Sequence, residues 1–241
     1  MAKSNILITG ANAQVGSYLA QHYHALGYPL WLWYHQRDER IRHLDVPKSS
    51  LDLRDYQAIQ AAYAEITEPI QVLIHCAAVR SSDAQPLADS DPATFRQVFD
   101  SNFYPAYYLL KTLLPSMRQA GFGRIILFSS DVVRSGLANG SAYAASKAAI
   151  ANMVKSAALE NARYNVLINC LAPGPIESNL EEDYQGEYLE FRRAYFARHI
   201  ENSRSGALIS KAELLAAVDY LKHPDLRNMI GEEIFLTGGK A

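Results

Sequence analysis

The residues with the clearest chemical potential are Tyr143 and Lys147, four positions apart in Tyr143-Ala-Ala-Ser-Lys147. In a helix, this spacing places both side chains on one face. Ser130 lies thirteen positions before Tyr143, directly after the apolar run Ile125-Ile-Leu-Phe-Ser129. A phenol, an ammonium group and a hydroxyl are together the groups that polarise and protonate a carbonyl.

The expected chemistry is proton transfer by the phenol of Tyr143. Free tyrosine has a pKa of about 10, which is too high for easy proton exchange at neutral pH. The ammonium group of Lys147 would stabilise the phenolate and lower that pKa, so that Tyr143 can protonate a developing alkoxide or accept its proton in reverse. Ser130 would hydrogen-bond the carbonyl oxygen, and that bond strengthens as the oxygen gains charge.

The same Tyr-Lys spacing recurs at Tyr107 and Lys111. Thirteen residues before Tyr107 lies Thr94, at the polar start of a predicted helix and far from any strand end. Spacing alone therefore does not select the site. The serine at a strand end selects Tyr143 and Lys147.

Strand-like and helix-like segments alternate along the chain. Strands are predicted at 5–9, 30–34, 71–75, 124–128, 165–171 and 233–236, and helices at 15–26, 55–66, 91–120, 141–163 and 211–221. Between 36 and 50 there is no room for a full helix plus a third strand, so we expect only a turn or two of helix around Asp38 to Ile41. The repeated order and the continuously apolar strands predict an α/β fold: a Rossmann-like doubly wound parallel sheet, in a single domain spanning 1–241.

The segment 179–206 breaks this pattern, because it is rich in tyrosine and charge and poor in apolar residues. It follows the C-terminal end of a predicted strand, where open α/β sheets bind ligands. We predict a mobile substrate lid within the domain. The alternative is an ordinary solvated surface helix.

Composition narrows the class of protein. The chain has 241 residues, 49% hydrophobic and 20% charged, which suits one globular domain. Its formal net charge is -2 without a basic stripe, so no nucleic-acid partner is predicted. No signal region and no apolar stretch of membrane-spanning length are present, so we expect a cytoplasmic protein with no membrane partner.

Cys76 and Cys170 lie in apolar runs and are expected to be buried thiols rather than a disulfide, and no metal site is expected.

A glycine-containing turn, Thr9-Gly10-Ala11-Asn12-Ala13-Gln14-Val15-Gly16, joins the first predicted strand to the first helix. Glycines let the backbone approach a pyrophosphate, whose charge is favoured at a helix N-terminus. Two glycines in such a turn are a weak signal by themselves. Their position after the first strand strengthens it.

Together these residues resemble the short-chain dehydrogenase/reductase superfamily, whose members carry Thr-Gly, three variable residues, Gly, one variable residue and Gly at this turn. The resemblance covers nearly the whole chain, although Gln14 stands at the middle glycine position. It implies hydride transfer from a nicotinamide, with Tyr143 as proton donor, Lys147 on the nicotinamide ribose and Ser130 on the carbonyl. It also implies that Asn102 is the fourth catalytic member, which bends its helix and holds a water leading to Lys147. The alternative is a surface asparagine without a catalytic role.

The resemblance further implies a set of cofactor contacts along the strand ends. They are Gly10, Asn12, Gln14, Val15, Gly16, Tyr34, His35, Arg37, Asp52, Leu53, Ala77, Ala78, Tyr143, Lys147, Pro173, Gly174, Ile176 and Ser178. No acidic residue stands at the tip of the second strand, where His35 and Arg37 are found, so NADP is favoured over NAD. The alternative is that Arg37 only pairs with Asp38 or Glu39.

The sequence gives two interpretations for each of four further features. Asp52 matches the family position that meets the adenine amino group, but it could equally cap the following helix. His75, in His75-Cys76-Ala77-Ala78, is expected to be a structural hydrogen-bonding residue rather than a catalyst, and the Pro173-Gly174 segment could be a bare turn. Asp131 could be a loop residue or could face the substrate.

The favoured activity is NADPH-dependent reduction of a ketone or 3-oxoacyl carbonyl to an alcohol. Gln14, the Tyr34-His35 pair and Asp131-Val-Val133 also look similar to the pteridine and dihydromonapterin reductase branch, so a dihydropterin reductase is the alternative. That branch has Asp where this chain has Ser130, and it carries Arg or Lys in the glycine turn. A non-catalytic NADP-sensing protein is the third possibility, opposed by the retention of all four catalytic residues.

Assembly into a homotetramer or homodimer is also expected from the resemblance, in which the long helices bearing Asn102 and Tyr143 form a four-helix interface. Small residues on the second of these helices would permit close packing between subunits. They are Ala144, Ala145, Ala148 and Ala149. The same residues could equally serve a contact within the chain.

Overall fold

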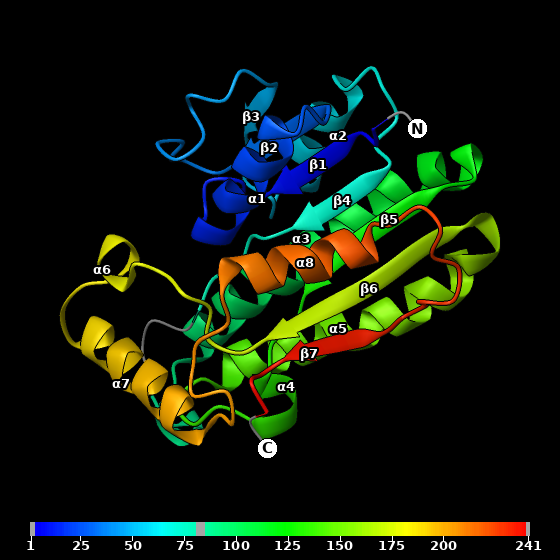
Figure 1. The fold of residues 1–241 in the computed structure, drawn as a ribbon. Coiled ribbons are helices and arrows are strands. Elements are labelled where there is room, and N and C mark those ends of the chain that lie inside the picture. Colours follow the sequence, from blue (N-terminus) through cyan, green and yellow to red (C-terminus); the bar gives the residue numbers. More distant parts are fainter. Residues whose placement is uncertain (1–2, 81–84, 240–241) are drawn as a thin grey trace.

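The computed structural model describes residues 3–80 and 85–239, and Figure 1 shows how their elements are arranged. The strands are β1 Ile6–Thr9, β2 Leu30–Tyr34, β3 Lys48–Ser50, β4 Val72–His75, β5 Gly123–Phe128, β6 Val166–Pro173 and β7 Glu233–Leu236. The helices are α1 Gln14–Ala25, α2 Tyr56–Ala64, α3 Pro92–Ala120, α4 Val132–Ser135, α5 Ser141–Asn161, α6 Leu180–Asp183, α7 Gly186–Asn202 and α8 Lys211–Leu221. Short 3₁₀ turns cover Leu87–Asp89 and Ala162–Tyr164.

Within the described ranges, the strands form one seven-stranded parallel sheet in the order β3-β2-β1-β4-β5-β6-β7. The chain leaves β1 toward β2 and β3, and then returns to place β4 on the other side of β1. This reversal opens a crevice at the carboxyl ends of β1 and β4, which is where doubly wound sheets bind ligands. The predicted fold class is confirmed.

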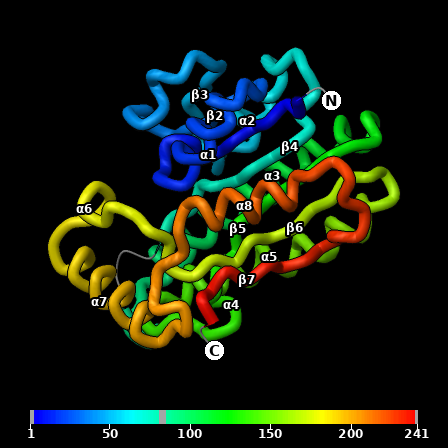
Figure 2. The backbone as a smooth tube through the Cα atoms, viewed as in Figure 1, coloured from blue at the N-terminus to red at the C-terminus, as the bar shows by residue number. Residues whose placement is uncertain are grey.

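Helices cover both faces of the sheet because successive strand residues point to opposite sides. Ile6 and Ile8 of β1 are fully buried in the cluster that contains residues of α1 and α8, whereas Leu7 lies in the cluster of α2, α3 and α5. Burial on both faces explains why β1, β4 and β6 are apolar without alternation. Figure 2 shows the segment of α6 and α7 beyond the carboxyl ends of the strands.

Side-chain caps set the starts of several helices. Asp55 accepts hydrogen bonds from the backbone N–H groups of Gln57 and Ala58, so Asp55 caps α2. The alternative in which Asp52 caps this helix is therefore wrong. Asp91 caps α3 in the same way, and Ser210 forms a capping box with Glu213 at the start of α8.

One local expectation is revised by the structure. Around Asp38 there is a hydrogen-bonded turn rather than helix: the carbonyl of Asp38 accepts from the N–H groups of Ile41 and Arg42, both at 2.8 Å, and the pattern does not propagate. In the segment 179–206, Arg192, Phe196 and His199 of α7 are buried, and most other residues of this helix are exposed.

Two further findings bear on the class of protein. Cys76 is half-buried and Cys170 is buried, and both are free thiols. Of the helices in the described residues, none combines the length and the apolar character required to span a membrane.

Candidate active site

The carboxyl end of β5 and the first turns of α5 bring three of the four predicted catalytic residues to one cavity of about 190 Å³. Ser130 directly follows the loop residue after β5, and Tyr143 and Lys147 lie on α5. Ten of the predicted site residues line this cavity: Gln14, Val15, Ala78, Ser130, Tyr143, Lys147, Pro173, Gly174, Ile176 and Ser178. Asp131 lines it too, so its assignment as a cavity-facing residue is supported.

Tyr143, Lys147 and Ser130 are all buried. The Lys147 Nζ donates a hydrogen bond to the backbone carbonyl of Phe128 at 2.7 Å and lies 5.8 Å from the centroid of the Tyr143 ring. The Ser130 hydroxyl donates to the Asp131 carboxylate at 3.2 Å. The sheet and α5 therefore hold the phenol, the ammonium and the hydroxyl together.

The electrostatic environment of Tyr143 favours proton transfer. Burial by itself would raise the pKa of Tyr143, but the positive charges of Arg80 and Lys147, followed by the Ser130 hydroxyl, lower the pKa below its ordinary value. The pKa of Lys147 is also lowered, chiefly because burial disfavours its charged form. Both shifts bring the pKa values of Tyr143 and Lys147 closer to neutral pH, where an acid or base with a matching pKa transfers protons most effectively.

The competing pair, Tyr107 and Lys111, lies elsewhere. Tyr107 is 40% exposed on α3, and neither residue lines the cavity. The Lys111 Nζ lies 6.0 Å from the Tyr107 ring, a separation close to that of Tyr143 and Lys147. Helical spacing thus produces the same local geometry twice, and only the place of the helix relative to the strand end separates the two pairs.

Asn102 is fully buried in α3, so the alternative of a surface asparagine is wrong. Its side-chain oxygen accepts from the N–H of Val79 at 2.8 Å, and its amide donates to the carbonyl of Val79 and to the Ser146 hydroxyl. Asn102 therefore ties the loop after β4 to α5 one residue before Lys147. Its role toward a water and Lys147 stays a prediction.

The glycine turn makes the close approaches expected of a phosphate-binding loop. A Cβ on Gly10 would lie 2.4 Å from the backbone nitrogen of Ala77, and a Cβ on Gly16 would lie 2.3 Å from the carbonyl oxygen of Gly10. At the N-cap of α1, Ala13 offers no side-chain hydrogen bond, unlike the capped starts of α2, α3 and α8. An uncapped helix start beside a glycine cradle fits a dinucleotide phosphate.

The side chains of this turn reach toward α6. Gln14 donates to the carbonyl of Asn179 and to the carboxylate of Asp183, both at 2.7 Å, and accepts from the N–H of Asn179 at 2.9 Å. Asn12 binds the loop after β2 instead, since its side-chain oxygen accepts from the N–H of Arg40 at 2.9 Å. Gln14 in place of a glycine thus connects the turn to the 179–206 segment.

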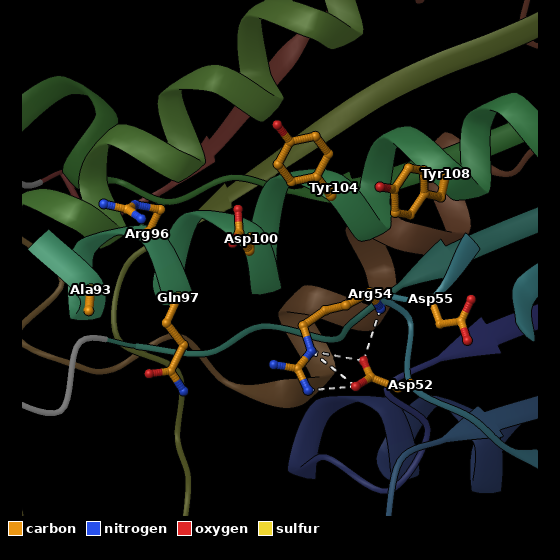
Figure 3. A pocket seen from close by; sticks show the side chains of 9 residues that line it. All are labelled: Asp52, Arg54, Asp55, Ala93, Arg96, Gln97, Asp100, Tyr104 and Tyr108. Atoms are coloured by element: carbon orange, nitrogen blue, oxygen red, sulfur yellow. Dashed lines mark hydrogen bonds and ion pairs between the residues drawn. The ribbon is translucent and has the colours of Figure 1, made fainter. Parts of the chain in front are cut away.

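The predicted adenosine end lies away from the catalytic cavity. Asp52 is held by Arg54 through side-chain hydrogen bonds (Figure 3), which keep the pKa of Asp52 at about 2. These two residues line a larger open hollow of about 690 Å³ between the loop before α2 and the face of α3 that carries Asp100, Tyr104 and Tyr108 (Figure 3). This hollow contains none of the predicted catalytic residues. Also outside the catalytic cavity are Gly10, Asn12, Gly16, Tyr34, His35, Arg37, Leu53, Ala77 and Asn102.

His75 is a hydrogen-bonding residue of the sheet, as predicted. Its Nδ1 lies 2.6 Å from the Thr9 hydroxyl across the β1–β4 pair. Its Nε2 is buried and has no hydrogen-bond partner among the described residues. Burial, followed by the charge of Lys147, lowers the pKa of His75 to about 3.

This shift predicts a pH-dependent loss of stability. Since the folded-state pKa of about 3 lies below the unfolded value near 6.5, only the unfolded chain takes up the proton between these limits. The free energy of unfolding should therefore fall as pH decreases below about 6.5, by about 1.4 kcal/mol per pH unit from this residue. Urea unfolding of wild type and His75→Asn at pH 7.5, 6.5 and 5.5 measures it, and parallel curves for the two proteins would contradict a neutral buried His75.

Three arginines that sequence patterns did not single out belong to this region. Arg40 donates to the carbonyl of Asn12 at 3.0 Å and pairs with Glu182 at 2.5 Å. Arg80 and Arg192 line the catalytic cavity. Arg80 follows the carboxyl end of β4 by a few residues, and that position was the available signal, whereas nothing in the local sequence distinguishes Arg192 from the neighbouring Arg193.

No group of three or more His, Cys, Asp or Glu side chains in the part of the chain that the structure describes is arranged to hold a metal ion.

Comparison with known proteins gives concordant results. A family model described as short chain dehydrogenase matches residues 4–188. The 3-oxoacyl-[acyl-carrier-protein] reductase MabA of Mycobacterium tuberculosis is 29% identical over 246 residues, which cover 98% of this chain and 92% of MabA. The 2,3-dihydroxy-2,3-dihydro-p-cumate dehydrogenase of Pseudomonas putida is 27% identical over 202 residues, covering 82% and 76% of the two chains. The crystal structure of levodione reductase has a TM-score of 0.88 at 24% identity, over 99% of this chain and 98% of that one.

Proposed function

The chain belongs to the short chain dehydrogenase family and is an oxidoreductase, and we propose that it reduces a carbonyl of ketone or 3-oxoacyl type to an alcohol with NADPH. One observation carries this proposal: Ser130, Tyr143 and Lys147 meet in a single cavity at the carboxyl ends of the strands. The similarity to MabA, a 3-oxoacyl reductase, supports the substrate type.

The proposed roles follow from the side chains. Ser130 hydrogen-bonds the substrate carbonyl and stabilises the charge that develops on its oxygen. Tyr143 gives that oxygen a proton, and Lys147 and Arg80 keep the resulting phenolate stable. When bound, the nicotinamide supplies the hydride. Its phosphates would lie at Gly10, Gly16 and the start of α1.

The preference for NADPH is supported by the exposed cation at the end of β2. Arg37 is exposed and forms no ion pair within the described residues, while Asp38 pairs with Arg42 at 3.3 Å. Arg37 had two alternative partners: Asp38 is therefore already engaged by Arg42, and Glu39 also lies 3.9 Å from Arg42. Arg37 would hydrogen-bond the 2′-phosphate of NADPH. Glu39 contacts the Asn12 amide at 3.3 Å in the same region, which makes NADH the necessary comparison.

The decisive experiment measures NADPH and NADH oxidation side by side with ketones, 3-oxoacyl thioesters and dihydropterins. We expect turnover with a carbonyl and a higher kcat/KM for NADPH. Arg37→Ala should narrow the difference between the two cofactors by reducing kcat/KM for NADPH. Higher efficiency with NADH in wild type would contradict the cofactor proposal, and turnover of dihydropterins alone would replace the carbonyl proposal with the pterin alternative.

The remaining expectations stay proposals. The non-catalytic NADP-sensing alternative requires cofactor binding without turnover of any compound in the panel.

The 179–206 segment would act as the substrate lid, because Tyr184, Arg192 and Phe196 form part of the cavity wall. A homotetramer or homodimer would form through α3 and α5, whose exposed residues include Tyr104 and Tyr107, and a monomer in solution would contradict it. A cytoplasmic location remains an expectation from the sequence.

A further inference from the structure

Arg192 is a buried arginine that pairs with no carboxylate among the residues 3–80 and 85–239. It is 3% exposed on α7, and it takes part in no ion pair with a carboxylate among the residues that the structure describes. Its Nε is buried without a hydrogen-bond partner in those residues. An uncompensated buried charge is costly, so its retention calls for a reason other than stability.

Arg124 shows how this protein treats an arginine that serves the fold. Arg124 is fully buried, and its guanidinium donates to carbonyls that include those of Gly123, Pro224 and Leu226 at 2.8–3.0 Å. Its donors are thus largely used by the chain. No comparable bonds are made by Arg192 within the described ranges. The Nε of Arg192, which lacks a hydrogen-bond partner among the described residues, remains available to a ligand.

The surroundings of Arg192 are aromatic and face the catalytic cavity. Its guanidinium carbon lies 4.9 Å from the ring centroid of Phe196, 5.3 Å from that of Tyr195 and 5.6 Å from that of Tyr184. All four residues line the cavity that contains Tyr143. Cation–π contacts offset part of the desolvation of the charge and leave the planar edge of the guanidinium for hydrogen bonding.

Arg80 supplies a second guanidinium from another part of the chain. It follows β4, lines the same cavity, and its guanidinium carbon lies 5.2 Å from the centroid of the Tyr143 ring. Arg80 likewise forms no ion pair in the described part of the chain. The positive charge of Arg80 also contributes, after burial, to lowering the pKa of Arg192. Two like charges that act on each other in one cavity are stabilised by an anion that binds between them.

We propose that Arg80 and Arg192 form a carboxylate-binding subsite and that the substrate is a small oxo acid, with its carboxylate one or two carbons from the reacting carbonyl. The short separation follows from Arg80, which lies over the ring of the proton donor itself. The small size follows from a cavity of about 190 Å³ lined by residues of both the cofactor turn and α7.

This inference rests on the proposed function and specifies its substrate. The balanced reaction is oxo acid + NADPH + H⁺ → hydroxy acid + NADP⁺. The carbonyl carbon gains the hydride, the oxygen gains the proton of Tyr143, and the carboxylate is unchanged. Arg192 acts here as a specificity-determining residue.

The test compares each acid with its methyl ester, which differs mainly in charge. Wild type, Arg192→Met and Arg193→Met are assayed with 2-oxobutanoate, 3-oxobutanoate and their methyl esters. Arg193 is the matched control, since it is adjacent on α7, 46% exposed and paired with Glu181 and Glu190 on the surface. We expect wild type to favour an acid over its ester, and Arg192→Met to reduce that ratio of kcat/KM by about 10- to 100-fold, as for lost hydrogen bonds to a charged group. Arg193→Met should retain the wild-type ratio.

Two readouts do not depend on turnover. Calorimetric binding of 2-hydroxybutanoate and 3-hydroxybutanoate, without nucleotide, should be weakened in Arg192→Met and retained in Arg193→Met. The melting temperature of Arg192→Met should equal or exceed that of wild type, because a buried unpaired charge is replaced by an apolar side chain of similar length. A lowered melting temperature together with an unchanged acid-to-ester ratio would show that Arg192 is structural and would overturn the proposal.

The outcomes separate this inference from the proposed function. Equal reduction of acids and esters by wild type would overturn the carboxylate subsite and leave carbonyl reduction standing. Binding of the hydroxy acids that depends on Arg192, without turnover of any carbonyl, would retain the subsite and overturn the proposed function. Should Arg192→Met fail to fold, Arg80→Met is measured instead, and an acid-to-ester ratio unchanged in that variant would count against the subsite.

Discussion

Replacing Tyr143 with phenylalanine should reduce kcat by about 10²- to 10⁴-fold, the usual contribution of a positioned general acid. The change removes one hydroxyl from a buried ring and leaves the packing of α5 in place. NADPH binding, measured by fluorescence titration, should remain close to that of wild type. Steady-state NADPH oxidation with the best carbonyl of the panel measures the loss.

Tyr107→Phe is the matched control for this experiment. Tyr107 has the same spacing to a lysine, but it is exposed on α3 and outside the cavity. The control should retain the wild-type kcat. A similar loss in both variants, or retained activity in Tyr143→Phe, would contradict the assignment of Tyr143 as proton donor.

Gly10→Ala is expected to give the largest loss of both stability and nucleotide affinity. Gly10 has a φ of +66°, and an added Cβ would meet backbone atoms of Ala77 at 2.4 and 2.6 Å. Ala77 lies two residues after the central strand β4, and its backbone atoms cannot move away as the end of a flexible side chain can. The turn must therefore shift from its place beside β4, which also displaces the N–H groups expected to hold the phosphates.

Gly121→Ala separates backbone strain from this close approach. Gly121 ends α3 with a φ of +65°, and no atom lies within 4 Å of an added Cβ. Both variants bear the penalty of a left-handed residue, about 1–2 kcal/mol. Gly10→Ala should lower the free energy of unfolding by about 1–3 kcal/mol more than Gly121→Ala, and this difference measures the effect of the clash with Ala77. Urea unfolding and NADPH titration measure both quantities, and equal values for the two variants would argue against a tight turn at Gly10.

Most of the architecture was predictable because it depends on short-range patterns. The strands β1, β4 and β6 are buried at every position and mostly apolar, as a parallel sheet covered on both faces requires. Helix starts were predictable to within a residue or two, since Asp55 and Asp91 cap through their own neighbours. The turn at Asp38 was harder to predict, because whether one helical turn propagates depends on the loop that follows.

The four proposed catalytic residues were also accessible from the sequence. Tyr143 and Lys147 share a helix, and Ser130 lies two residues after β5, so local geometry and a single connection bring them together. Asn102 could be assigned only by matching its position to the family resemblance. Its burial and its hydrogen bonds to Val79 and Ser146 became evident only in the structure. The sequence likewise left open whether Asp52 caps α2, and the structure excludes this because Asp55 is the cap.

By itself, the sequence determined the order of strands and helices, the glycine turn and the Ser-Tyr-Lys set, because each rests on periodicity or on residues joined by one connection. Only the tertiary structure decided the polarity of the cavity. Arg192 and Arg193 are adjacent and chemically identical, yet one is buried beside Tyr143 and the other is paired on the surface. That difference arises from how α7 lies across the strand ends, a contact between segments some fifty residues apart that no local pattern records.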